Sequence, residues 1–449
     1  MLYAGVVFYL ILQFLRPQEF LPLIRGARLV FYSMILLTPP WLATLQFKKV
    51  FRTPQDYFML LFCVICALSY LNWWPTRIQE PAEEMGKTLL CYLFVVHVID
   101  TRRKLVGALW LVMMMLLIVA LMAHEIQIGP TRGQYASIGM FDNRNDFAYA
   151  LAMMLPVAFA FVLRGDPFAK ICGAGVLLAG MAELVATDSR GGQLASMFAA
   201  YSTIFVLARS KVGRGVLLVV GVVVLMFAFA FSARLGTIGS YQQDESAMDR
   251  VYIWSNALEM FKDHPLIGVG WKKFREYSKR DSHSSYMRAI AELGGVGLAL
   301  YLGMLFFALR DAHNLARNAP HPSLRMAGLA LTGVLVGHLV ASLFQTRLYH
   351  TFVLVQIAIV SALRLVSDRE RAAERATQGS GAPTAVPAPV PAASAGPGAA
   401  APEPPNLWER SVGFGLKSPG LITRLDLLRI GGLTFACWLV HKIFIMKSG

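Results

Sequence analysis

Residues 105–122 read LVGALWLVMMMLLIVALM, eighteen consecutive residues without a charged side chain. At about 1.5 Å per residue, a helix of this length spans roughly 27 Å, which is close to the thickness of the hydrocarbon core of a bilayer. The stretch therefore predicts a transmembrane helix.

Comparable apolar runs recur along the chain. They lie at residues 2–15, 29–45, 57–73, 88–99, 105–122, 147–163, 171–187, 192–208, 215–232, 288–309, 325–343 and 351–366. Charged residues make up only 15% of the 449 residues, against about 25% in soluble domains. We therefore expect an all-α polytopic membrane bundle of about 12 transmembrane helices.

Every second loop of this bundle is basic. The clusters are Lys48, Lys49 and Arg52; Arg102, Arg103 and Lys104; Arg164 and Lys170; Arg209, Lys211 and Arg214; Arg310, Arg317 and Arg325; and Arg364, Arg369 and Arg371. By the positive-inside rule these loops are cytoplasmic, which predicts a multi-pass protein of the bacterial inner membrane. The net charge of +15 comes mainly from these clusters, so it does not indicate a nucleic-acid partner.

The first outward loop breaks this pattern, because it carries Arg16, Arg25 and Arg28. Either these basic residues are functional, or the first helix is misplaced. The start of the chain lacks a basic segment and a small-residue cleavage site, so we expect a retained helix rather than a removed signal peptide.

Composition divides the chain into three parts. Residues 1–366 form the expected membrane domain, with 233–287 as a large periplasmic loop. Residues 367–406 form an Ala/Pro-rich cytoplasmic linker, which cannot bury enough apolar surface to fold. Residues 407–449 hold a C-terminal apolar or amphipathic helix that either spans the membrane or lies in its interface. The five cysteines, Cys63, Cys66, Cys91, Cys172 and Cys437, lie in apolar runs and are expected to be structural, with no metal bound.

The long outer loop holds a concentration of polar and charged residues. Arg250 stands at the start of a helical pattern in which Trp254, Leu258 and Phe261 share one face. An Arg at a helix N-terminus is a poor match to the helix dipole unless a bound phosphate lies between them. The alternative is a solvated or salt-bridged Arg250.

Two further polar elements face the same side. Thr187-Asp188-Ser189-Arg190-Gly191-Gly192 is an abrupt turn between apolar runs, in which Arg190 offers a planar fork suited to phosphate. A tight turn with a snorkelling Arg is the alternative. Asp142-Asn143-Arg144-Asn145-Asp146 precedes the next expected helix. Asn145 or Asp146 is expected to cap that helix; alternatively, Arg144 and Asn145 line a site.

His283 is the candidate for proton transfer, because an imidazole with a pKa near about 6.5 accepts a hydroxyl proton at neutral pH. An ordinary surface histidine is the alternative. Arg144, Asn145, Trp254, Arg288 and Arg347 are further candidates to line the same site.

The order of these elements resembles the O-antigen ligase and O-antigen polymerase superfamily of polytopic membrane glycosyltransferases. The resemblance rests on Ser189-Arg190-Gly191-Gly192, Arg250 with Trp254, His264-Pro265-Leu266-Ile267-Gly268-Val269-Gly270, and His283 followed by Glu292-Leu293-Gly294. Many members have Asn directly after the His, whereas this chain has His283-Ser284-Ser285-Tyr286. That departure, together with Leu15-Arg16-Pro17-Gln18-Glu19, looks like the O-glycosylation ligase branch associated with exosortase loci.

The resemblance implies a GT-C-like helical fold and transfer of an oligosaccharide from a polyprenyl diphosphate carrier, such as undecaprenyl diphosphate, to an acceptor hydroxyl. No metal, cofactor or nucleotide sugar is implied. Arg190 and Arg250 would bind the donor diphosphate, and His283 would act as the base. The acceptor is a glycan, a lipid or a protein, as in lipopolysaccharide or exopolysaccharide synthesis.

Three other functions remain open from the sequence. A polymerase would extend carrier-linked repeats, whereas a ligase would use a different acceptor. A flippase for lipid-linked glycans would need polar residues along the bundle interior, but the mid-span ionisable residues are few, chiefly His97, Glu183 and His338. A scaffold of an envelope assembly complex would leave the ordered Arg and His elements unexplained.

Overall fold

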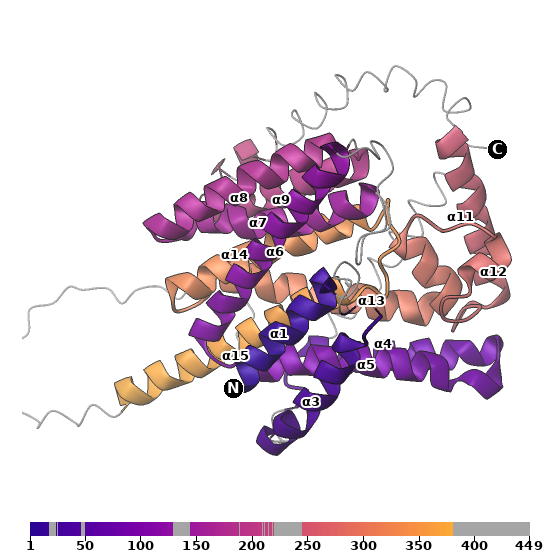
Figure 1. Cartoon of the computed structure of the whole chain (residues 1–449), viewed down its shortest axis with the longest axis horizontal. Coiled ribbons are helices and arrows are strands. Elements are labelled where there is room, and N and C mark those ends of the chain that lie inside the picture. Colours follow the sequence, from indigo (N-terminus) through magenta and orange to yellow (C-terminus); the bar gives the residue numbers. More distant parts are fainter. Residues whose placement is uncertain are drawn as a thin grey trace, which may run out of the picture.

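The computed structural model describes residues 1–17, 24, 26–45, 50–128, 144–187, 189–208, 210, 212–213, 215–217, 219 and 245–379. All regular structure in these ranges is helical, and the helices form one polytopic membrane bundle (Figure 1). The predicted fold class is thereby confirmed.

The helices follow the expected order. They are α1 (Leu2–Leu15), α3 (Leu29–Thr44), α4 (Pro54–Ser69), α5 (Gln79–Val98), α6 (Arg102–Ile128), α7 (Arg144–Arg164), α8 (Pro167–Ala186), α9 (Arg190–Leu207), α11 (Glu245–Asp263), α12 (Phe274–Ser278), α13 (Ser285–Asn318), α14 (Pro322–Ala341) and α15 (Thr351–Gly379). Short 3₁₀ turns at Tyr70–Asn72 and Pro75–Arg77 join α4 to α5. Each predicted run coincides with one helix except 215–232, most of which lies outside the described residues. Seven of the described helices are long and apolar enough to cross a membrane, and α1 and α3 are shorter apolar helices.

Helix α14 lies at the centre of the bundle and packs against α7, α9 and α13. Small residues allow this close packing, as they commonly do between helices in lipid. A Cβ at Gly328 would come within 2.4 Å of the Ala316 backbone nitrogen, and one at Gly333 within 2.6 Å of Pro156 Cβ. The central helices therefore form a rigid support for the loops at their ends.

One end of the bundle is tied together by the basic segments. Arg102 pairs with Glu370 at 3.9 Å, the Arg369 guanidinium donates to the Asp100 carbonyl at 3.0 Å, and Arg364 pairs with Asp311 at 2.7 Å. These contacts join the α5–α6 connection, the end of α13 and the second half of α15. The ends of α1, α4, α8 and α14 and the starts of α5, α7, α9, α13 and α15 lie at the opposite end, in agreement with the alternation of the loops.

Helix α15 is longer than the apolar run that predicted it. It continues to Gly379, so residues 367–379, expected to begin the linker, extend the last helix instead. Good helix formers and the Arg364–Asp368 pair, 3.9 Å apart and one turn along the helix, support this extension. The rest of the predicted linker and the C-terminal segment 407–449 lie outside the described residues.

Candidate active site

Two glycine bends fix the outer loop to α13. Helix α13 departs from helical geometry at Gly294, where φ is 67° and ψ is −166°. The bend releases the carbonyls of Ala291 and Glu292, which accept from the nitrogens of Val269 and Gly270 at 2.9 and 3.0 Å. The nitrogen of Gly295 in turn donates to the Pro265 carbonyl at 2.8 Å. The loop is therefore held to α13 by backbone hydrogen bonds in both directions.

Glycine is required at both bends. Gly268 has a φ of 69°, and a Cβ there would lie 2.2 Å from the Glu292 carbonyl carbon. A Cβ at Gly294 would lie 2.4 Å from the backbone of Leu266. Positive φ and close backbone approach together explain why His264-Pro265-Leu266-Ile267-Gly268 and Glu292-Leu293-Gly294 form one unit.

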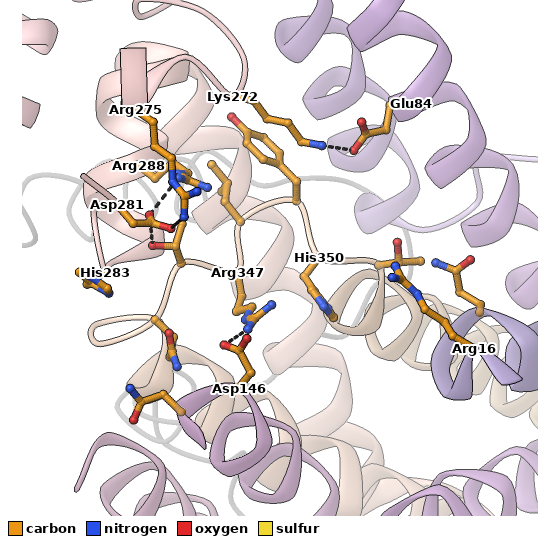
Figure 2. A pocket seen from close by; sticks show the side chains of 17 residues that line it. Arg16, Glu84, Asp146, Lys272, Arg275, Asp281, His283, Arg288, Arg347 and His350 are labelled. Carbon is orange, nitrogen blue, oxygen red and sulfur yellow. Dashed lines mark hydrogen bonds and ion pairs between the residues drawn. The ribbon is translucent and has the colours of Figure 1, made fainter. Parts of the chain in front are cut away.

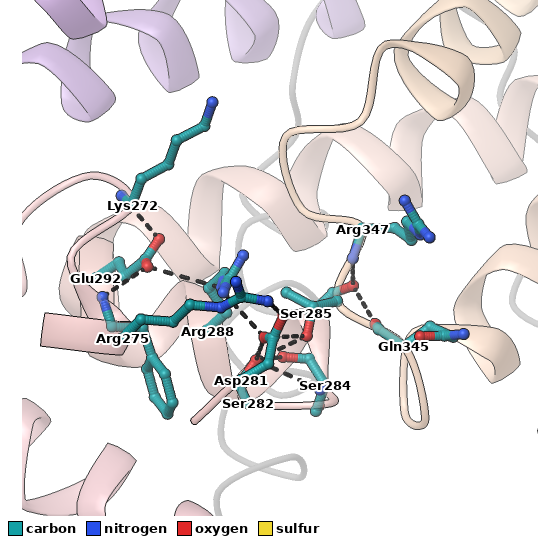
Figure 3. A network of polar contacts seen from close by, with 12 residues as sticks. Lys272, Arg275, Asp281, Ser282, Ser284, Ser285, Arg288, Glu292, Gln345 and Arg347 are labelled. Atoms are coloured by element: carbon teal, nitrogen blue, oxygen red, sulfur yellow. Dashed lines mark hydrogen bonds and ion pairs between the residues drawn. The ribbon is translucent and has the colours of Figure 1, made fainter. Parts of the chain in front are cut away.

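Glu292 is fully buried beside this bend and organises the residues around it (Figure 3). Its carboxylate accepts from the backbone nitrogens of Lys272 at 3.1 Å and Phe274 at 2.9 Å, and from the Tyr349 hydroxyl at 2.7 Å. The Nε of Arg288 lies 3.6 Å from it. A buried carboxylate is tolerated because these donors satisfy it.

The segment around His283 is held by a second network (Figure 3). Asp281 accepts from Arg275, Arg288 and Thr346, each at 2.9 Å. Burial raises the pKa of Asp281, but the charges of Arg288 and Arg275 outweigh this effect and the net pKa is lowered. Asp281 is therefore ionised at neutral pH and joins the outer loop to the α14–α15 connection.

The serines that follow His283 have defined roles. Ser284 caps α13, and its hydroxyl accepts from the Met287 nitrogen at 3.4 Å. The Ser285 hydroxyl donates to the Gln345 carbonyl at 2.8 Å and accepts from the Arg347 nitrogen at 2.9 Å. These bonds hold the α14–α15 connection against the start of α13, with His283 immediately before them.

A cavity of about 540 Å³ opens where these segments meet (Figure 2). Among the described residues it is lined by the end of α1, the starts of α5, α7, α13 and α15, the 272–283 segment and the α14–α15 connection. All of these segments belong to the end of the bundle opposite the basic loops.

The cavity is predominantly cationic. Among the residues that the structure describes, five cationic side chains line it against three carboxylates, Glu84, Asp146 and Asp281, which leaves two formal positive charges with neutral histidines. Lys272 pairs with Glu84, Arg347 with Asp146, and Arg275 and Arg288 with Asp281. Such a surface attracts anionic groups.

His283 lies at the rim of this cavity, solvent-exposed and with a positive φ of 48°. Partial burial lowers the pKa of His283 below its ordinary value; Asp281 raises it, and Arg250, Arg275 and Arg288 lower it. The imidazole is therefore neutral at pH 7 and is able to accept a proton.

Two comparisons with known proteins bear on the function. Residues 174–302 match the family model described as O-Antigen ligase. The exopolysaccharide production protein ExoQ of Rhizobium meliloti is 24% identical over 307 residues, which cover 60% of this chain and 68% of that protein. Both matches support a relationship to the O-antigen ligase and polymerase superfamily. The chain is a multi-pass membrane protein, and both matches support a function of the ligase or polymerase type.

One solved structure is also similar, in a study entitled "Structural coordination of polymerization and crosslinking by a peptidoglycan synthase complex". The match has a TM-score of 0.42 and 19% identity, and covers 70% of this chain and 98% of the other.

The residues matched by the O-antigen ligase model run from α8 to the first half of α13. They include the Ser189 turn, Arg250 and His283. Ser189 is the N-cap of α9, and its hydroxyl accepts from the Gly192 nitrogen at 3.4 Å. Gly191 packs against Phe344 of the α14–α15 connection, so this turn lies beside the cavity.

The structure brings together some of the predicted site residues. His283, Arg288, Arg347 and Asn145 line the cavity. Asp146, one of the two residues expected to cap this helix, forms a buried ion pair with Arg347.

Four predicted residues stand outside the cavity lining. Trp254 donates its indole N–H to the Ser282 carbonyl at 3.0 Å and so supports the His283 segment. Arg250 is partly buried on α11 and acts on His283 through its charge. Arg190 is exposed at the start of α9, and Arg144 is exposed at the start of α7. Asp142, Asn143 and Asp188 lie outside the described residues.

Several charged or titratable residues that line the cavity were not singled out as its members by the sequence. They include Arg16, Lys272, Arg275, Asp281 and His350. Of these residues, only Arg16 was marked in the sequence, because its basic charge lies in a loop that the alternation assigns to the outer side. Its position favours the functional explanation of that exception over a misplaced first helix.

Proposed function

We propose that the protein transfers a glycan from a polyprenyl diphosphate carrier to an acceptor hydroxyl on the periplasmic side of the inner membrane. The observation that carries the proposal is the cationic cavity with a neutral histidine at its rim. A cationic surface attracts the anionic groups of such substrates, and a weak hydroxyl nucleophile needs a neutral base.

The donor diphosphate is assigned to Arg190 and Arg250. Both belong to the part of the chain matched by the O-antigen ligase model, and the charge of Arg250 acts on His283. Guanidinium groups stabilise the charge that develops on a diphosphate as it leaves, more strongly near a dry site than in bulk water.

His283 is assigned as the base. It takes the proton of the acceptor hydroxyl while the hydroxyl oxygen forms a bond to the anomeric carbon of the donor glycan. The bond between that carbon and the phosphate oxygen breaks, and the carrier diphosphate leaves with the electron pair. A positioned base contributes about 10² to 10⁴ in rate.

Polymerisation of carrier-linked repeats is the second candidate. The similarity to a protein named for exopolysaccharide production favours it, whereas the family model is described as a ligase. The two functions differ in the acceptor and share the donor chemistry.

The charge of the loops supports a periplasmic location of the site. The cavity opens at the end of the bundle opposite Arg102, Arg364 and Arg369. The positive-inside rule assigns the basic end to the cytoplasm.

Reconstituted protein with a polyprenyl diphosphate glycan and several acceptors tests the proposal. The expected result is a new glycosidic product and release of carrier diphosphate, both slowed by about 10² to 10⁴ in His283→Ala, with donor binding retained. Movement of the carrier between leaflets without a new glycosidic bond would instead identify a flippase.

A further inference from the structure

His338 lies fully buried in the last turn of α14. It is one of the few ionisable residues within the apolar runs. Both of its ring nitrogens are hydrogen-bonded: Nδ1 lies 2.7 Å from the Tyr149 hydroxyl of α7, and Nε2 lies 2.6 Å from the Tyr301 hydroxyl of α13. One imidazole therefore links three helices. We call Tyr149, His338 and Tyr301 the Tyr–His–Tyr network.

A neutral imidazole suits the position of His338. Its tyrosine partners are neutral hydroxyls, which do not offset the cost of burying a cation. A neutral imidazole donates from one nitrogen and accepts at the other, so it bonds to both hydroxyls at once. Tyr149 and Tyr301 are only 2% and 0% exposed. A buried polar network that is hydrogen-bonded in this way fixes one arrangement of the helices that it joins.

The Tyr–His–Tyr network reaches the segment of His283 through Ser342. The Ser342 nitrogen donates to the His338 carbonyl at 2.8 Å, and the Ser342 hydroxyl lies 3.2 Å from His338 Nε2. The Ser342 carbonyl accepts from the Ser285 nitrogen at 2.9 Å and from the Ser284 hydroxyl at 3.3 Å. Ser284 and Ser285 directly follow His283 in the chain. The backbone that carries the proposed base is therefore hydrogen-bonded to the residue that His338 contacts.

The network reaches Arg347 of the cavity lining through Tyr149. The Cζ of Arg347 lies 5.7 Å from the centre of the Tyr149 ring. Asp146, which pairs with Arg347, lies one turn before Tyr149 on α7. The Arg347 nitrogen donates to the Ser285 hydroxyl at 2.9 Å (Figure 3). The contacts through Ser342 and those through Tyr149 therefore meet at the start of α13.

We propose that His338 is a positioning residue, which holds His283 and Arg347 in the relative placement that glycan transfer requires. His338 does not itself line the cavity, so it acts through the residues that it holds. The inference rests on the proposed function, because that function makes His283 the base. A displacement of about 1 Å in a site slows a reaction by about 10². The positive φ of His283, 48°, makes its placement dependent on the contacts of its neighbours.

Steady-state transfer by the reconstituted full-length protein tests the network at a temperature at which every variant is folded. His338→Phe keeps a ring but removes both hydrogen bonds, so kcat should fall by about 10 to 10² while KM for donor and acceptor stays near the wild-type value. His338→Gln keeps a donor and an acceptor and should recover part of the lost kcat. Tyr149→Phe and Tyr301→Phe each remove one hydroxyl and should lower kcat about twofold to tenfold.

A double variant tests whether the residues act together. Once His338→Phe has removed the hydrogen bond to Tyr301, adding Tyr301→Phe should lower kcat little further, because both changes remove the same interaction. Independent roles would instead give losses that multiply.

Tyr92→Phe is the matched control at the other end of the bundle. Tyr92 is 1% exposed, and its hydroxyl is hydrogen-bonded to Asp56 at 2.7 Å and to Ser361 at 2.8 Å. The control should lower the melting temperature as Tyr301→Phe does but leave kcat unchanged. Hydrogen exchange of residues 282–287 and 345–349 should rise in Tyr301→Phe and not in Tyr92→Phe.

Wild-type kcat in His338→Phe, Tyr149→Phe and Tyr301→Phe would overturn the proposal. Equal losses of kcat in Tyr92→Phe and Tyr301→Phe would do so as well, since they would reflect a general loss of stability. If His338→Phe does not fold, the two Tyr→Phe variants carry the test, because each removes a single oxygen atom.

Failure of the proposed function is distinguishable from failure of this inference. If wild-type protein forms no product, the proposed function fails, and hydrogen exchange alone decides whether the network holds the two segments. Faster exchange of both segments in Tyr301→Phe supports the network, and an exchange pattern equal to that of Tyr92→Phe overturns it.

Discussion

Replacing Gly294 by Ala tests whether the bend in α13 builds the site. The new Cβ would lie 2.4 Å from the Leu266 backbone, and the φ of 67° with ψ of −166° is a region that only Gly adopts readily. Backbone strain of about 1–3 kcal/mol and overpacking of about 1–3 kcal/mol add to roughly 2–6 kcal/mol. At about 2 °C per kcal/mol, the melting temperature should fall by about 4–12 °C.

Gly295→Ala is the matched control. Its nearest contact would be the Pro265 carbonyl oxygen at 3.4 Å, which is ordinary van der Waals distance, and its φ is not positive. The assay is thermal unfolding of each purified variant in detergent, followed by glycan transfer at a temperature at which all variants are folded. Gly294→Ala should lose transfer even there, because the bend positions the segment that precedes His283.

The reasoning would be refuted if the melting temperature of Gly294→Ala lay within about 1–2 °C of that of Gly295→Ala and the variant kept its transfer rate. A difference of this size corresponds to roughly 1 kcal/mol or less. In that event the hydrogen bonds between the two bends would not determine the geometry of the loop.

Three further predictions concern the site. The transfer rate should fall on the acid side of neutrality with a midpoint below about pH 6.5, because His283 must be neutral and its pKa is lowered. Asp281→Asn should move this midpoint to lower pH, since Asp281 raises the pKa of His283. An upward shift of the midpoint in a pH–rate profile of Asp281→Asn would contradict the assignment. Arg190→Lys should weaken donor binding more than Arg102→Lys does, because the fork is lost while the charge stays; equal donor affinities would count against the donor role. Trp254→Phe removes a hydrogen bond of 3.0 Å to the Ser282 carbonyl and should destabilise the protein by about 0.5–1.5 kcal/mol, so an unchanged melting temperature would deny it this supporting role.

Hydropathy predicted the bundle well because the length of an apolar run is fixed by the bilayer. Helix α6 is the clearest case. Helix α5 was recognised only from residue 88, although it begins at Gln79, because its first turns are charged. Glu84 in those turns pairs with Lys272 at the cavity, a tertiary contact that hydropathy does not contain.

The site was only partly accessible to sequence reasoning. His283 and Arg288 belong to the same short stretch of the chain, and both line the cavity. Arg347 and Arg16 reach it from connections far away in sequence, and the Asp146–Arg347 pair depends on how α7 packs beside the α14–α15 connection. The periodicity of an apolar run specifies a helix face but not which loops meet at its end.

The two glycine bends illustrate a second limit. The sequence marked Gly268 and Gly294 as parts of motifs, and the structure gives the reason, because each bend fills the space beside the other. Residues 367–379 illustrate a third limit: an Ala-rich charged segment is compatible with either a linker or a helix, and here it continues α15.

The most direct test of the central claim is single-turnover transfer by reconstituted protein with a radiolabelled polyprenyl diphosphate glycan. We expect wild-type protein to form a glycosidic product with release of carrier diphosphate, and His283→Ala to bind the donor equally but to form product about 10² to 10⁴ more slowly. Product formation by His283→Ala at the wild-type rate would contradict the assignment of His283 as the base.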